Sequence, residues 1–83
     1  MKTYKIDVRQ EFIDAGIQGN PCECPIAKAC FADHALRVRV GPESVRRFSN
    51  GIVATLPEKA IKFVEAFDTA RETAKPFQFE ITL

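Results

Sequence analysis

Four residues of the types that bind metal ions lie close together in the first half of the chain. Cys22, Cys24, Cys30 and His34 fall within thirteen residues. Thiolate sulfur and imidazole nitrogen are ligands that Zn²⁺ prefers in proteins. Cys30 and His34 are four residues apart, which places both side chains on one face of a helix. These four residues are therefore a candidate zinc site.

Other features of the same segment argue against a metal. Structural zinc sites use wider ligand pairs than Cys-x-Cys and take them from separated segments. Cys30 shares one stripe of the predicted helix with Ile26 and Ala29, where cysteine usually packs as a small hydrophobic residue. A histidine at a helix end, such as His34, usually hydrogen-bonds the last carbonyl groups. We therefore expect no cofactor, and zinc remains the alternative.

Cys24 precedes Pro25 at the predicted start of a helix. The partial positive charge of a helix N-terminus favours the thiolate form of a cysteine, and a thiolate can act as a nucleophile or in redox chemistry. Such chemistry needs a base or a second thiol nearby, and the sequence offers only His34 and Cys22. We therefore expect Cys24 to be structural, supporting the helix whose entry Pro25 fixes.

Four arginines lie on either side of one predicted turn, which carries Glu43 as its single carboxylate; they are Arg37, Arg39, Arg46 and Arg47. Guanidinium groups bind carboxylates and phosphates in a bidentate manner, so the patch is a candidate site for an acidic protein surface, a nucleotide or a nucleic acid. Phe48 is the one aromatic residue among them, and the whole chain has a net charge of only +1, which argues against nucleic acid. A solvated face paired with acidic residues is the alternative.

The composition excludes several classes of protein. With 46% hydrophobic and 28% charged residues, the chain is not intrinsically disordered. It contains no Gly-rich phosphate loop, no Ser-His-Asp set and no evident pair of carboxylates in an apolar setting, so we do not expect an enzyme. No apolar run approaches the roughly 20 residues of a membrane span, and no signal-peptide core is present. Three cysteines, an odd number, indicate a reducing compartment, so we expect a cytoplasmic protein without membrane contact.

The first half of the chain predicts one strand and two helices. Tyr4, Ile6 and Val8 alternate with charged residues, as in a half-buried strand. Residues 10–17 place apolar side chains at helical spacing before a glycine. Residues 25–34 predict a second helix, because proline suits the first helical position.

The second half predicts three strands, a long helix and a last strand. The three strands cover residues 36–40, 44–48 and 52–56, with a tight type I′ turn at Asn50-Gly51 between the last two. An amphipathic helix then begins at residues 57–58 and ends before Pro76, and residues 77–83 alternate again. The order β-α-α-β-β-β-α-β predicts an α+β domain covering residues 1–83, with a mainly antiparallel sheet of about five strands and helices packed on one face.

Several segments together resemble a group of small uncharacterised proteins encoded by phages and prophages. They are Ile13 with Gly16, the C-P-I-A-x-A segment from Cys24 to Ala29, Leu56-Pro57, Phe63, and the C-terminal F-D … P-F-x-F segment formed by Phe67-Asp68 and Pro76-Phe77-x-Phe79. The resemblance also implies an aliphatic residue at the position of Cys30, which argues further against zinc. The resemblance implies accessory biology such as host takeover or counter-defence.

The expected function is therefore that of a non-enzymatic phage or mobile-element accessory protein. We expect it to inhibit a host or defence-system protein by binding it, and to form a homo-oligomer because a small domain has little surface of its own. One alternative is an oligomer that sequesters a small anionic, nucleotide-like ligand, using Arg37, Arg39 and Arg47 with the helix start at Cys24 and Pro25. The other is a nucleic-acid-binding protein that acts through the arginine hairpin.

Overall fold

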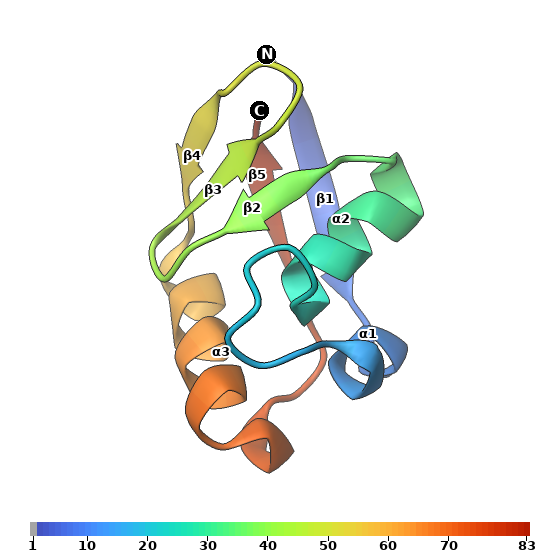
Figure 1. The fold of residues 1–83 in the computed structure, drawn as a ribbon, viewed down its shortest axis with the longest axis vertical. Helices are drawn as coiled ribbons and strands as arrows, with labels where there is room; N and C mark the ends of the chain where they lie inside the picture. The colour runs from blue at the N-terminus through green and yellow to red at the C-terminus, as the bar shows by residue number, and fades with distance from the viewer. Residues whose placement is uncertain (1) are drawn as a thin grey trace.

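The computed structural model describes residues 2–83 and contains both helices and strands (Figure 1). The element order confirms the predicted α+β class. In chain order the elements are β1 (Thr3–Val8), α1 (Gln10–Ala15), α2 (Pro25–His34), β2 (Val38–Val40), β3 (Ser44–Arg47), β4 (Val53–Thr55), α3 (Glu58–Thr69), the 3₁₀-helix η1 (Arg71–Thr73) and β5 (Phe77–Thr82).

The five strands divide between two antiparallel sheets. The first and last strands, β1 and β5, form one sheet, in which Thr3 lies opposite Thr82. The other sheet has the order β2-β3-β4, and no hydrogen-bonded ladder joins β4 to β5. Alternation of apolar residues marks a strand without identifying its neighbour, so the division into two sheets was not predictable from that pattern.

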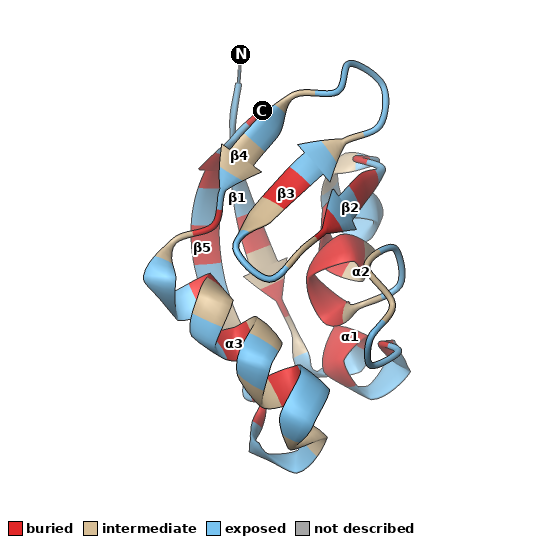
Figure 2. Cartoon of the chain, turned by 60° about the vertical axis from the view of Figure 1, so that its left-hand side comes forward, coloured by how far each residue is buried: buried red, intermediate tan, exposed pale blue. Residues whose placement is uncertain are grey.

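The hydrophobic core lies between the two sheets and is closed by helices (Figure 2). Helix α2 packs against both β1 and β2, and its side chains Ile26, Ala29 and Cys30 are fully buried. Helix α3 packs on the other side through phenylalanines, since the ring centroid of Phe63 lies 4.7 Å from that of Phe77 in β5. The small residues of α2 let the helix approach both sheets closely.

The turn between β3 and β4 lies where the sequence predicts it but has a different geometry. A type I′ turn needs positive φ at both central residues, whereas only Gly51, at +71°, has a positive φ in this loop. The loop is longer than two residues: the Gly51 N–H donates to the Arg47 carbonyl, and the Ile52 N–H donates to the Asn50 side-chain oxygen. The side-chain bond of Asn50 thus replaces the tight turn that the Asn-Gly pair predicts.

A contact between Gly16 and Pro25 fixes how the chain enters α2. Pro25 occupies the first turn of α2 and Cys24 is the residue before it, as the sequence predicts. A Cβ atom built on Gly16 would lie 2.6 Å from the Pro25 Cδ atom and 3.0 Å from the Phe12 carbonyl oxygen. Gly16 has an ordinary negative φ, so glycine is required here for space and not for backbone conformation.

We predict that Gly16→Ala lowers the free energy of unfolding by about 1–3 kcal/mol, because the methyl group must displace the proline ring or the end of α1. The matched control is Gly41→Ala, whose Cβ atom would lie 3.4 Å from the Ser44 carbonyl oxygen. The control should change stability by less than about 1 kcal/mol. Denaturant unfolding measures both, and equal stabilities of the two variants would contradict the packing argument.

Candidate functional site

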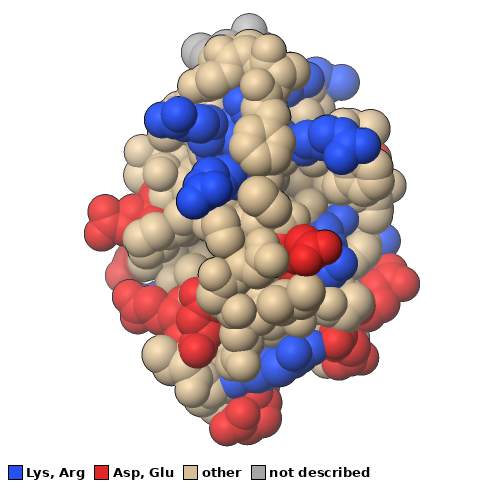
Figure 3. Space-filling model, in the orientation of Figure 1, with Lys and Arg blue, Asp and Glu red and all other residues tan. Residues whose placement is uncertain are grey.

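Three of the four predicted arginines lie on the solvent-exposed outer side of the three-stranded sheet, which we call the arginine face. Arg39 of β2 lies directly opposite Arg46 of β3, and Arg37 precedes Arg39 by two residues on the same side. All three are exposed, whereas the alternate residues Val38, Val40 and Val45 point into the core. In Figure 3 basic side chains gather over the upper part of the molecule, where the strands lie, and acidic and basic side chains are mixed in the lower part.

No ion pair within 4.0 Å neutralises the arginine face among residues 2–83. The Arg37 guanidinium instead lies 4.8 Å from the centroid of the Phe31 ring. Like charges at directly opposite positions of two strands repel one another and destabilise a sheet. The Arg39 and Arg46 pair is therefore a small cost to folding that the structure itself does not offset.

Large apolar side chains border the arginine face. Phe31 is 50% exposed, Phe48 is 54% exposed, and Val53, which lies directly opposite Arg46, is 52% exposed. Phe48 is next to the arginines in sequence, whereas Phe31 comes from α2 and reaches this surface only through tertiary packing, so it could not be predicted from the local sequence. A cavity of about 240 Å³ separates Phe31 and Phe48 and has Arg37 on its wall.

Arg47 is separated from the other three arginines. It is paired with Val38 and points to the inner side of the sheet, where its guanidinium lies 6.0 Å from the Tyr4 ring centroid. Arg47 is half-buried. It therefore belongs to the contact between the two sheets.

Two other arginines, which the sequence analysis did not single out, have structural roles. Arg9 binds Asp33 through two hydrogen bonds of 3.0 and 3.1 Å and Glu11 through a third of 2.8 Å, so it ties β1 to α2. Arg71 donates to the backbone carbonyls of Ile13 and Asp14 at the end of α1. The partners of Arg9 and Arg71 in α2 and α1 are far away in sequence, so no local pattern revealed these contacts.

The four residues of metal-ligand type do not come together. Cys22 is exposed, Cys24 is half-buried at the start of α2, and Cys30 is fully buried in the core. His34 lies at the end of α2, where its Nε2 atom is 2.7 Å from the Lys5 carbonyl oxygen in β1. Within residues 2–83 no three His, Cys, Asp or Glu side chains are grouped as metal ligands would be.

Burial raises the pKa of two of the three cysteine thiols. It raises the pKa of Cys24, and the N–H groups of Ala27 and Ile26 at the helix start oppose this shift only in part. Burial also raises the pKa of Cys30, from 9.0 to about 12. Both residues are therefore thiols at neutral pH, which fits the structural role expected for Cys24.

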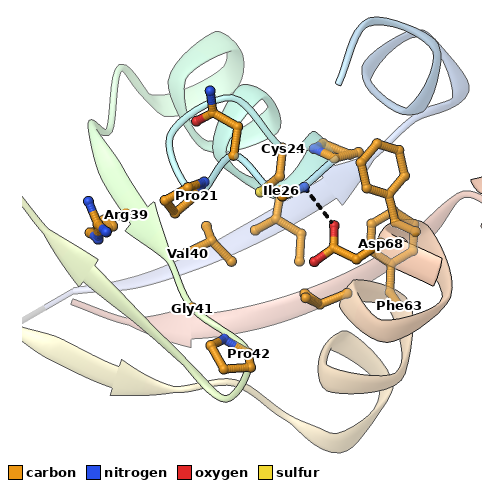
Figure 4. A pocket seen from close by; sticks show the side chains of 14 residues that line it. Pro21, Cys24, Ile26, Arg39, Val40, Gly41, Pro42, Phe63 and Asp68 are labelled. Atoms are coloured by element: carbon orange, nitrogen blue, oxygen red, sulfur yellow. Dashed lines mark hydrogen bonds between the residues drawn. The ribbon is translucent and has the colours of Figure 1, made fainter. Parts of the chain in front are cut away.

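A cleft lies between α3, the loop before α2, and the end of β2. Its volume is about 590 Å³. The floor is apolar and includes Ile26, Val40 and Phe63, and Cys24 also lines the cleft (Figure 4). Asp68 of α3 lies on one wall, and Arg39 joins the cleft to the arginine face. The predicted Cys24-Pro25-Ile26 and Phe67-Asp68 segments thus meet at one place.

The comparisons with known proteins do not add to this geometry. No protein-family model, curated protein or solved structure matches the chain. None of the helices in the described part of the chain is long and apolar enough to cross a membrane.

The raised pKa of Cys30 predicts a loss of stability at alkaline pH. Because the folded-state pKa is above the unfolded value, this stabilising contribution is complete below pH 9 and is lost as the pH rises from about 9 towards 12, at up to about 1.4 kcal/mol per pH unit. Unfolding free energies measured from pH 8 to pH 10.5 should fall more steeply for the wild type than for Cys30→Ala. Equal slopes would contradict the assignment, since all other groups are common to both proteins.

Proposed function

We propose that this chain is a non-catalytic binding domain that attaches to an acidic surface of another protein through the arginine face. The observation that supports this function is the pair of directly opposite arginines, Arg39 and Arg46, with Arg37 beside them and no carboxylate partner within 4.0 Å in residues 2–83. An acidic partner removes the repulsion and accepts bidentate hydrogen bonds from each guanidinium.

The apolar border of the face supports a protein partner over a bare polyanion. Arginine and aromatic side chains are enriched at the centres of protein interfaces, where they supply most of the binding energy. Phe31, Phe48 and Val53 are exposed at the edge of the charged area, and Arg37 lies over the Phe31 ring. A partner surface with carboxylates next to an apolar group matches this arrangement.

The biological setting that we propose follows from the sequence resemblance. In this setting the chain is a phage or mobile-element accessory protein that acts in the host cytoplasm. It inhibits a host or defence-system protein by occupying an acidic surface, and it needs no cofactor. This mode of action requires no reacting group, in keeping with the absence of an evident catalytic set in the sequence.

We predict that Arg46→Glu raises the stability of the fold and weakens its binding to an acidic partner. A glutamate opposite Arg39 replaces repulsion with attraction, so the free energy of unfolding should rise by roughly 0.2–1 kcal/mol. Binding to a fluorescein-labelled decapeptide of Glu and Tyr should weaken by at least about tenfold, because a guanidinium contact is lost and a like charge is added. Fluorescence anisotropy measures the affinity, and denaturant unfolding measures the stability.

The matched control for this variant is Lys59→Glu, which makes the same charge change at an exposed position of α3. The control should weaken peptide binding by less than about threefold, through long-range charge alone. Equal effects of Arg46→Glu and Lys59→Glu would show that net charge and not the arginine face attracts the peptide. Tighter binding of a 12-nucleotide single strand than of the peptide would replace the protein partner with a nucleic acid.

We also propose that the chain forms a homo-oligomer through a strand edge. β4 is an edge strand of the three-stranded sheet and β5 is an edge strand of the two-stranded sheet, and such an edge is where a second copy can add a strand. Size-exclusion chromatography with light scattering should give a mass of at least twice 9.3 kDa at micromolar concentration. A mass of one chain up to about 100 μM would overturn this part of the proposal.

A further inference from the structure

The cleft between α3 and β2 carries two charged groups of opposite sign at its two ends. Figure 4 shows Arg39 on one side and Asp68 on the other, with Val40 and Ile26 between them. Neither side chain has an ion-pair partner within 4.0 Å among residues 2–83. A ligand that fits this cleft therefore has an anionic end, an apolar or planar middle, and an end that donates hydrogen bonds.

The Asp68 carboxylate is positioned by the loop before α2 and still has free acceptor capacity. Its Oδ1 atom accepts one hydrogen bond, of 3.2 Å, from the Gly19 N–H. The Gln18 side chain donates to the neighbouring Phe67 carbonyl at 2.7 Å, so the loop is held to α3 at two points. A carboxylate accepts about four hydrogen bonds, so most of the acceptor sites of Asp68 remain for a ligand.

The cleft has the size and lining of a small-molecule site. A volume of about 590 Å³ lies within the range of roughly 300–1,000 Å³ that is usual for such sites, and an apolar lining with few polar groups is typical of them. Pro21 and Pro42 form part of the rim and lack N–H groups. The Asn20 side chain also lines the cleft, but its oxygen accepts from the Cys22 N–H and its amide nitrogen donates to Glu23. The orientation of a ligand is therefore set mainly by the carboxylate of Asp68 and the guanidinium of Arg39.

We propose that this cleft binds a guanine nucleotide. The edge of guanine presents two adjacent donors, the ring N1–H and the 2-amino group, which match the two oxygens of one carboxylate. Adenine and cytosine place a ring nitrogen acceptor beside their amino group, and uracil flanks its N–H with carbonyl oxygens, so each brings a lone pair towards Asp68. The planar base lies on the apolar floor near Ile26 and Phe63.

The phosphate group of the nucleotide lies at the opposite end, against Arg39. Arg46, the cross-strand neighbour of Arg39, lies on the arginine face and does not line the cleft, so Arg39 is the guanidinium that meets the anion. Arginine binds phosphate oxygens in a bidentate manner, so one guanidinium can hold the phosphate group at this end. This site is distinct from the proposed protein interface, although Arg39 lies at the boundary of both.

The test uses the full chain and four nucleoside monophosphates, GMP, AMP, CMP and UMP, at 1 mM. GMP should raise the unfolding midpoint by about 4 °C or more, and the other three should raise it less. Titration calorimetry should give a Kd for GMP that is at least about tenfold lower than that for AMP. Guanosine, which lacks the phosphate, should bind at least about tenfold more weakly than GMP.

The decisive variant is Asp68→Asn, with Glu65→Gln as its matched control. Asparagine retains an oxygen that can accept the Gly19 N–H, so the loop stays in place, but it replaces an acceptor with a donor at the base. Glu65 is exposed on the same helix outside the cleft, and its substitution removes the same charge. Asp68→Asn should weaken GMP binding by at least about tenfold, and Glu65→Gln by less than about twofold.

Two results would overturn the proposal. One is the absence of any midpoint shift with GMP at 1 mM, and the other is GMP binding that Asp68→Asn leaves unchanged. The variant Arg37→Glu separates this proposal from the protein interface, because Arg37 lies on the arginine face but does not line the cleft. Arg37→Glu should weaken binding of the acidic peptide and change the Kd for GMP by less than about threefold.

Discussion

The close packing of α2 between the two sheets is the contact on which the rest of the structure depends. The helix can pack closely against both β1 and β2 because its buried residues include the small side chains of alanine and cysteine. Its direction is fixed at both ends. Pro25 rests on Gly16 at the start, and His34 is bonded to the Lys5 carbonyl at the end, next to the Tyr4 ring at a centroid distance of 5.2 Å.

Helix α2 contributes residues to both candidate binding regions. Its first turn forms part of the cleft, and its later turns carry Phe31 to the border of the arginine face. The loop before α2 also bonds to β2, through the Val40 N–H and the Pro21 carbonyl at 2.8 Å. Pro21 and Val40 line the cleft, and Cys22 and Val38 line the small cavity beside Phe31, so the same two bonded segments contribute to both regions.

Local patterns in the sequence predicted the elements well and their arrangement only in part. The proline at the start of α2 lies where helical propensity places it, and α3 begins at Glu58, within the predicted residues 57–58. Alternation also identified the exposed side of β2, because neighbouring valines had to be buried. The contacts that could not be predicted join residues that are far apart in the sequence. Arg9 donates a hydrogen bond to Asp33, which is 24 positions further along the chain, and the Gly19 N–H donates to Asp68, which is 49 positions further along. No periodicity encodes such pairs.

The pairing of β1 with β5 has a consequence for synthesis on the ribosome. Thr3 and Thr82 are the ends of one ladder, so Ile6 and Val8 have no sheet partner until nearly the whole of this sequence has been translated. At about 5–20 residues per second, the first strand waits roughly 4–15 s for the last one. The meander of β2, β3 and β4 pairs neighbouring segments and can form during that interval. The nascent chain therefore presents an unpaired apolar strand at its beginning, which is the segment where chaperones would bind and where aggregation would begin.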